Sequence, residues 1–145
     1  MTTDTAELSM ETSRVIAAPR ERVFDAWLDP EMLARFMMPK PGMSIPEARS
    51  DAREGGRFRI VMRAGDQDMP HEGTYKEINR PNRLSFTWEG PFSTVEDSTV
   101  TLDFDEVQDG TKVTLRHVRF VDEESRESHK SGWAGILQAL DEALA

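Results

Sequence analysis

Cysteine is absent from the sequence, and its absence excludes several kinds of site. The chain can have no disulfide framework, no thiolate nucleophile and no zinc site of the cysteine type. Long hydrophobic runs are also missing, and residues 1–11 are polar and acidic, without the basic start of a signal peptide. We therefore expect a cytoplasmic protein that does not insert into membranes.

Positive charge is scarce: the sequence has 18 Lys and Arg residues and 27 Asp and Glu residues, which gives a formal net charge of -9. Nucleic-acid binding depends on Lys and Arg side chains that neutralise phosphates, and the sequence has no basic cluster. Arg57, Arg59 and Arg63 alternate with apolar residues, which is the pattern of a solvated strand face. We expect no nucleic-acid partner.

Familiar catalytic motifs are lacking as well. The sequence has no glycine-rich phosphate loop, no serine in a nucleophile-elbow setting and no carboxylate pair with a convincing catalytic placement. The three histidines, His71, His117 and His129, do not have metal-ligand spacing. They fall on two predicted strands and on the C-terminal helix, which favours places in the core or at a cavity. We expect no metal and no cofactor.

The most informative stretch that is present is residues 122–145, which we predict to be one long helix. At about 100° per residue, its apolar side chains fall on one face: Trp133, Ile136, Leu137, Leu140 and Leu144. Asp122 is placed to act as the N-cap.

Gly132 and Gly135 lie inside this helix, where each glycine costs about 1 kcal/mol of helix stability relative to alanine. Close approach of another backbone, or room for a ligand, would offset that cost. Ordinary helix–sheet packing is the alternative.

The chain before this helix reads as one strand, two short helices and a run of strands. Residues 8–17 form the first strand, Pro19 begins one helix, and Pro30 begins the next after its cap Asp29. Alternation of apolar and polar residues predicts strands over residues 45–51, 57–63, 71–78, 84–88, 95–106 and 111–120. Asp109-Gly110 is a hairpin signal between the last two.

Strands segregated from helices indicate the α+β class. We expect a curved antiparallel sheet of about six or seven strands around the long C-terminal helix, with the two short helices after the first strand. Residues 1–8 are predicted to be a flexible tail, and residues 9–145 a single domain.

Several segments together carry a family resemblance. They are APRERVFDAW at 18–27, MLARF at 32–36, DAREGGRF at 51–58, GTYKEI at 73–78, PNRL at 81–84 and HKSGW at 129–133. In this order they resemble the START-like (SRPBCC, helix-grip) superfamily, and within it the domain of the heat-shock protein 90 ATPase activator homologues. The resemblance implies a sheet that grips the C-terminal helix and a cavity for a hydrophobic or amphipathic small molecule. Phe36-Met37 stands where many relatives have a tryptophan pair, which should change the shape of the pocket.

The leading functional prediction is therefore binding of such a molecule between the C-terminal helix and the sheet. Its polar end would meet His117, His129 or Tyr75. The residues expected to line the site are Trp27, Phe36, Phe58, Ile60, Tyr75, Trp88, His117, His129, Trp133 and Leu137. One alternative is a cyclase- or hydratase-like enzyme with a cavity histidine as acid–base. Another is a protein-interaction module, co-chaperone-like and stress-related, with a chaperone partner. The resemblance also makes a homodimer plausible.

Overall fold

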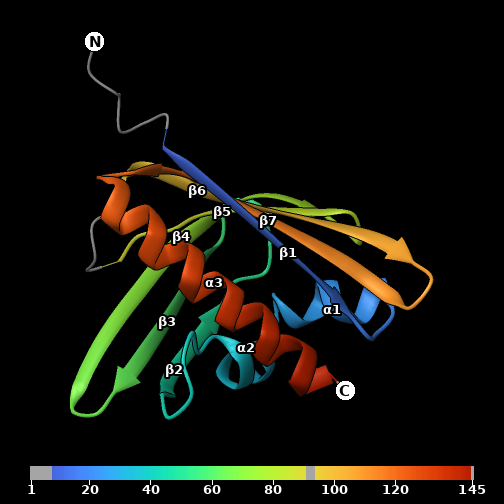
Figure 1. The fold of residues 1–145 in the computed structure, drawn as a ribbon, viewed down its shortest axis with the longest axis horizontal. Helices are drawn as coiled ribbons and strands as arrows, with labels where there is room; N and C mark the ends of the chain where they lie inside the picture. The colour runs from blue at the N-terminus through green and yellow to red at the C-terminus, as the bar shows by residue number, and fades with distance from the viewer. Residues whose placement is uncertain (1–7, 91–93, 145) are drawn as a thin grey trace.

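The computed structural model describes residues 8–90 and 94–144 and confirms the α+β helix-grip architecture (Figure 1). The strands are β1 (Ser9–Ile16), β2 (Ser44–Ser50), β3 (Arg57–Ala64), β4 (Gln67–Asn79), β5 (Arg83–Thr87), β6 (Thr94–Val107) and β7 (Gly110–Phe120). The helices are α1 (Arg20–Ala26), α2 (Pro30–Phe36) and α3 (Glu123–Leu144). Among the described residues, none of the helices has the length and hydropathy of a membrane span.

The strands form one antiparallel sheet in the order β1-β7-β6-β5-β4-β3-β2. The sheet is strongly curved, and α3 lies across its concave side, with β3 and β4 on one side of the helix and β1 and β7 on the other (Figure 1). Helix α2 packs against both β2 and α3. This arrangement gives most strands one face toward the core and one toward solvent.

The helix boundaries follow from local capping. The side chain of Asp122 accepts a hydrogen bond from the Ser125 backbone N–H at 2.8 Å, and Asp29 caps α2 through the Glu31 N–H at 3.0 Å. Both N-caps, Asp122 and Asp29, were predicted from the sequence. Pro19 differs: it is the N-cap of α1, with extended backbone angles (φ -61°, ψ 149°), and is not its first helical residue. Proline suits either position because it has no N–H to leave unpaired.

The arginines of β3 form the solvated face that alternation predicts. Arg57 and Arg63 are exposed, and Arg59 is half-buried. Each arginine pairs with a carboxylate of a neighbouring strand or loop, as in the bonds from Arg63 to Asp68 at 2.6 Å and from Arg59 to Glu47 at 3.1 Å. Exposed pairs of this kind contribute at most about 1 kcal/mol each, so this face favours solubility more than stability.

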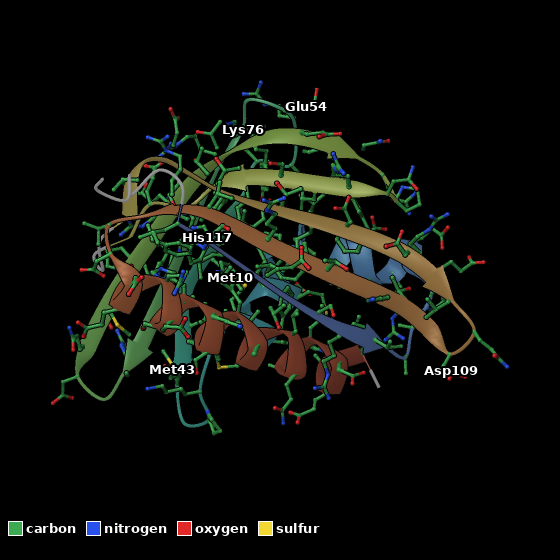
Figure 2. All side chains as sticks on the ribbon, turned by 45° about the horizontal axis from the view of Figure 1, so that its top comes forward. Met10, Met43, Glu54, Lys76, Asp109 and His117 are labelled. Carbon is green, nitrogen blue, oxygen red and sulfur yellow. The ribbon has the colours of Figure 1, made fainter. Side chains whose placement is uncertain are left out.

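The β6–β7 hairpin confirms the turn at Asp109-Gly110, with Asp109 at its exposed tip (Figure 2). Gly110 has φ +141°, and a Cβ at this position would collide with the Ile16 carbonyl. Only glycine therefore allows the hairpin to lie so close to the end of β1.

The N-terminal boundary differs by one residue from the expected tail. Leu8 is buried, and its carbonyl accepts a hydrogen bond from the Arg119 N–H at 2.9 Å. Residues 1–7 of that predicted tail lie outside the described residues, as do residues 91–93 of the loop after Gly90.

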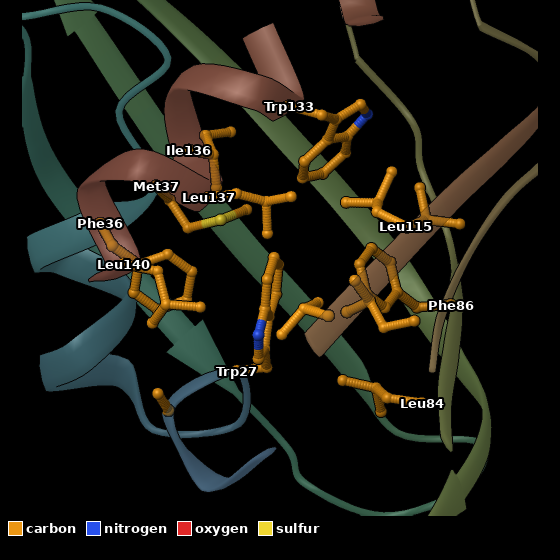
Figure 3. Close-up of a cluster of buried hydrophobic side chains, with 14 of the residues drawn as sticks. Trp27, Phe36, Met37, Leu84, Phe86, Leu115, Trp133, Ile136, Leu137 and Leu140 are labelled. Atoms are coloured by element: carbon orange, nitrogen blue, oxygen red, sulfur yellow. The ribbon is translucent and has the colours of Figure 1, made fainter. Parts of the chain in front are cut away.

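The core lies between α3 and the sheet. The predicted helix face, Trp133, Ile136, Leu137, Leu140 and Leu144, is buried there. Figure 3 shows Trp27 at the centre of this cluster, with Leu137 and Leu140 of α3 on one side and Phe86 and Leu84 of β5 on the other. The indole of Trp27 is 2% exposed, so it fills space that could otherwise have remained open under the helix.

Candidate ligand-binding groove

An open groove of about 450 Å³, here called the α3 groove, lies between the first half of α3 and the β3–β4 hairpin. Its helix wall consists of Ser128, His129, Ser131, Gly132, Trp133 and Ile136. Its sheet wall consists of Met62, Ala64, Met69, His71 and Trp88. The loop that follows α2 provides the third wall, through Pro39, Lys40 and Met43. A volume of this size is within the usual range for small-molecule sites.

A second void, deeper under α3, measures only about 10 Å³. It is lined by Trp27, Leu33, Met37, Phe58, Ile60, Tyr75, Phe86 and Trp88. Such a space holds at most one water molecule. Trp88 lines both voids and therefore separates the open groove from the closed core.

The structure divides the predicted site residues between these two regions. Trp88, His129 and Trp133 line the α3 groove. The remainder are in the closed core: Trp27, Phe36, Phe58, Ile60, Tyr75, His117 and Leu137. The core is closed because its aromatic rings interlock, with Trp27 edge-on to Phe36 at 5.0 Å and Phe58 edge-on to Phe86 at 5.3 Å between centroids. A ligand contact of these core residues stays a prediction.

His117 is fully buried on β7 and joins the sheet to α3. The indole Nε1–H of Trp133 donates to His117 Nδ1 at 3.1 Å, which requires Nδ1 to be unprotonated. The proton therefore sits on Nε2, which donates to Ser98 Oγ at 2.7 Å. The Ser98 hydroxyl in turn donates a hydrogen bond to the Val118 carbonyl at 3.3 Å. Both nitrogens of His117 are thus engaged by the protein.

The environment of His117 also favours its neutral form. Burial lowers the pKa of His117 to about 3, and the nearby His129 adds to this shift. The ring is therefore uncharged at neutral pH. Because both of its nitrogens bond to protein groups and its surface is covered, His117 holds α3 on the sheet.

His129 lines the α3 groove one turn before Trp133. Its Nδ1–H donates to the Ser125 carbonyl at 2.8 Å, so in the neutral ring the lone pair is on Nε2. Burial lowers the pKa of His129, and the hydrogen bond to Ser125 opposes that shift. No hydrogen bond from the described residues engages Nε2. His129 therefore offers a hydrogen-bond acceptor that a ligand can use.

His71, on β4, lines the groove but was not among the predicted site residues. Its side chain is only 7% exposed and stacks on Trp88 with centroids 4.8 Å apart. Burial lowers the pKa of His71 to about 4. The Met69 backbone opposes this shift, but Nδ1 has no partner of good hydrogen-bonding geometry among the described residues. The alternation along β4, which puts Met69, His71 and Tyr75 on one face, was the signal that could have identified it.

Tyr75, expected at the polar end of a ligand, already has a partner. Its hydroxyl lies 2.8 Å from Ser50 Oγ, and burial raises the pKa of the phenol. The ring is 2% exposed and packs against Phe58. Its polar atom is therefore satisfied inside the protein, at the small void and away from the open groove.

The two helix glycines have different surroundings: close approach of another backbone is confirmed at Gly135, and room for a ligand at Gly132 stays a prediction. A Cβ on Gly135 would collide with the Pro39 carbonyl, so glycine here allows the close approach of another backbone. A Cβ on Gly132 would meet only the Pro39 Cβ at 3.4 Å, and Gly132 lines the groove. The loop after α2 is thus held against α3 at Gly135 and forms the third wall at Gly132.

The groove residues do not form a conventional metal site. Among residues 8–90 and 94–144, no group of three or more His, Cys, Asp or Glu side chains could hold a metal ion. Lys40 is the only charged side chain among the described residues that line the groove. The chemistry offered is therefore an apolar surface of indole and thioether groups with a few neutral hydrogen-bonding groups.

Comparison with known proteins places this geometry in a family. No curated protein sequence matches the chain. Solved structures do: protein CV1439 from Chromobacterium violaceum is 26% identical, with a TM-score of 0.84 over 94% of this chain and 97% of that one. Protein NE0264 from Nitrosomonas europaea is 27% identical, with a TM-score of 0.79 over 96% and 95% of the two chains. The AHSA1-like protein from Aeromonas hydrophila is 26% identical, with a TM-score of 0.80 over 93% and 90%.

The family model described as Activator of Hsp90 ATPase homolog 1-like protein matches residues 17–145. That span contains all three helices and every strand except β1. The match confirms the resemblance that the sequence motifs indicated, in a fold that commonly has a ligand-binding cavity. The chain belongs to the Activator of Hsp90 ATPase homolog 1-like family.

Proposed function

We propose that this protein binds a mostly apolar small molecule with one polar end in the α3 groove. The observation that carries the proposal is the groove itself, about 450 Å³ of open space beside a core that is otherwise filled. Apolar walls with a small number of placed polar groups are the usual composition of such sites.

The two ends of the ligand would meet different surfaces. Its apolar body would lie against Trp88, Trp133 and the methionines, whose flexible thioether side chains adapt to the shape of a ligand. Its polar end would meet His129 Nε2 and the hydroxyl groups of Ser128 and Ser131. This differs from the expected use of His117 and Tyr75, because both of those side chains already have protein partners.

The charge of the groove favours an uncharged or acidic polar end. The protein carries a net charge of -9, yet the described groove residues include no carboxylate and one cation, Lys40. A ligand cation would have no carboxylate to pair with there. An acidic group near Lys40 would gain a charge-assisted contact.

A thermal-shift screen of apolar and amphipathic compounds tests the proposal. A compound present at about 100 times its Kd stabilises the native state by about 2.7 kcal/mol. For a chain of this size that corresponds to a rise in Tm of roughly 5–10 °C. A screen in which no compound raises the Tm in a concentration-dependent way contradicts the proposal.

A matched pair of variants locates the site. Ser128 and Ala134 are both exposed residues of α3, but only Ser128 lines the groove. Ser128→Trp should fill the groove and abolish the Tm response, whereas Ala134→Trp should leave it unchanged. Equal responses from the two variants would place the bound compound elsewhere.

A further inference from the structure

The α3 groove is rich in thioether and imidazole groups. Three of the eight methionines, Met43, Met62 and Met69, line it, together with two of the three histidines, His71 and His129. The described groove residues include no Asp, Glu or Cys. Thioether sulfur and neutral imidazole nitrogen are soft or borderline metal ligands, so the groove differs in kind from a carboxylate site.

The strand register brings three of these groups together. Met62 of β3 is directly opposite Met69 of β4, and His71 follows Met69 by two residues. All three side chains therefore point to the same face of the sheet. Directly opposed residues have Cβ atoms about 5 Å apart, and alternate residues of one strand are about 7 Å apart. The three rotatable bonds of each methionine allow both sulfur atoms to reach one point beside His71.

The ring of His71 is oriented so that Nδ1 faces β3, where Ile60 is directly opposite His71 and Met62 is two residues further along the strand. A Cβ on Gly90 would lie 2.7 Å from His71 Cδ2 and 3.2 Å from Nε2, so that edge of the ring faces Gly90. Gly90 follows β5, which is on the opposite side of β4 from β3. Nδ1, on the other edge of the ring, is therefore on the β3 side of β4. It is buried there beside the Met69 backbone and has no partner of good hydrogen-bonding geometry among the described residues.

The helix wall of the groove offers a further metal ligand, the neutral imidazole of His129. His129 donates its Nδ1–H to the Ser125 carbonyl, which leaves the Nε2 lone pair available. Metal-ligating histidines commonly have this arrangement, in which a backbone carbonyl fixes the tautomer and the orientation of the ring. Met43 provides a third thioether from the loop wall.

We propose that the α3 groove contains a binding site for a soft monovalent metal ion, copper(I), formed by the thioethers of Met62 and Met69 and by His71 Nδ1, with His129 as the ligand from the helix. Thioether and imidazole ligands select copper(I) over magnesium and calcium, which require oxygen ligands. This proposal does not rest on the binding of an organic ligand.

Silver(I) is the probe, because it has the same charge and softness as copper(I) and does not change oxidation state. Silver nitrate is titrated into the full chain in chloride-free buffer, and binding is followed by calorimetry and tryptophan fluorescence. The expected result is saturable binding of one ion per chain with quenching of the emission. The double variant Met62→Leu/Met69→Leu removes two proposed ligands and should weaken binding by about tenfold or more, since even loss of an outer-shell partner costs about 10–100-fold in metal affinity.

The control is Met32→Leu, a methionine of α2 that packs on the core and does not line the groove. It should bind silver(I) as the unmodified chain does. Exchange of methionine for leucine conserves volume and costs less than about 1.5 kcal/mol, so folding is retained and is checked by circular dichroism. If the double variant does not fold, the two single variants give the same comparison.

Two results would overturn the proposal: no saturable binding at a stoichiometry of one, or equal affinity in the unmodified chain and the leucine variants. Both are distinguishable from failure of the small-molecule proposal. The metal proposal is tested by silver(I) titration with no organic compound present, and the small-molecule proposal by the thermal-shift screen with no metal present, so each can fail while the other holds.

Discussion

At the scale of single residues, the bond between Trp133 and His117 is the contact with the clearest consequence. It joins α3 to β7 inside the core, where neither group can turn to water instead. Loss of one partner would leave the buried Nδ1 of His117 unpaired, which costs about 1–3 kcal/mol.

Trp133→Phe should therefore lower the free energy of unfolding by more than its loss of buried area explains. Trp27→Phe is the matched control, because the indole Nε1 of Trp27 is buried without a hydrogen-bond partner among the described residues. Urea denaturation should show an additional loss of about 1–2 kcal/mol for Trp133→Phe relative to Trp27→Phe. Equal losses would mean that the hydrogen bond to His117 contributes nothing.

The buried histidines also predict how stability depends on pH. The pKa values of His71 and His117 fall to about 4 and about 3 in the folded chain, and that of His129 is lowered as well. Each imidazole returns to an ordinary pKa of about 6.5 when the chain unfolds. The unfolded state then binds more protons, so the stabilisation is fully present above pH 6.5 and is lost as the pH falls toward 4.

Between pH 7 and pH 5, each histidine whose folded pKa stays below 5 should reduce the free energy of unfolding by about 2 kcal/mol. Urea denaturation at a series of pH values measures this dependence. Unchanged or increased stability at pH 5 would show that the histidines are not held neutral in the folded protein.

The sequence predicts where the histidines lie better than it predicts what their nitrogens do. The alternation of β7 and the phase of α3 placed His117 and His129 on inner faces, and the structure agrees. The partners of each nitrogen depend on distant residues such as Ser98 and Trp133, whose approach no local pattern specifies. For the same reason, His71 was not among the predicted site residues.

At the scale of elements, the loop after α2 and the glycines of α3 determine the shape of the groove. Pro39 contacts α3 at two successive turns, with its carbonyl at Gly135 and its ring at Gly132. Periodicity correctly predicted α3 and most strands to within a few residues. It could not place this loop, because a loop has no repeating pattern and its path is decided by tertiary contacts.

The two glycines give opposite expectations for the same substitution. Gly135→Ala should destabilise the protein by about 1–3 kcal/mol, since the new methyl group collides with the Pro39 backbone. Gly132→Ala should be neutral or stabilising by up to about 1 kcal/mol, because alanine favours the helix and its Cβ meets only an ordinary contact. Thermal denaturation of both variants measures the contrast. Equal effects would contradict the close approach of Pro39 at Gly135.

At the scale of the whole molecule, one curved sheet and one long helix enclose two different environments. One end is closed by interlocked rings around Trp27, and the other is open between α3 and the β3–β4 hairpin. The order of elements and the family motifs predicted the helix-grip fold. They did not predict which end is open, because aromatic side chains of the same type either fill a cavity or line one, depending on how their rings pack.

The central claim is that a ligand reaches the α3 groove while the core around Trp27 stays closed. The chain has three tryptophans, and two of them, Trp88 and Trp133, line the groove, whereas Trp27 lines only the small void.

Each of the three tryptophans gives one indole N–H signal in a two-dimensional ¹H–¹⁵N spectrum, and the signals are assigned from Trp→Phe variants. A titration with 8-anilinonaphthalene-1-sulfonate, an aromatic anion, can therefore distinguish the two regions. We predict saturable shifts of the Trp88 and Trp133 signals and none of Trp27. A spectrum in which no indole signal moves, or in which Trp27 moves as much as the other two, would contradict the account.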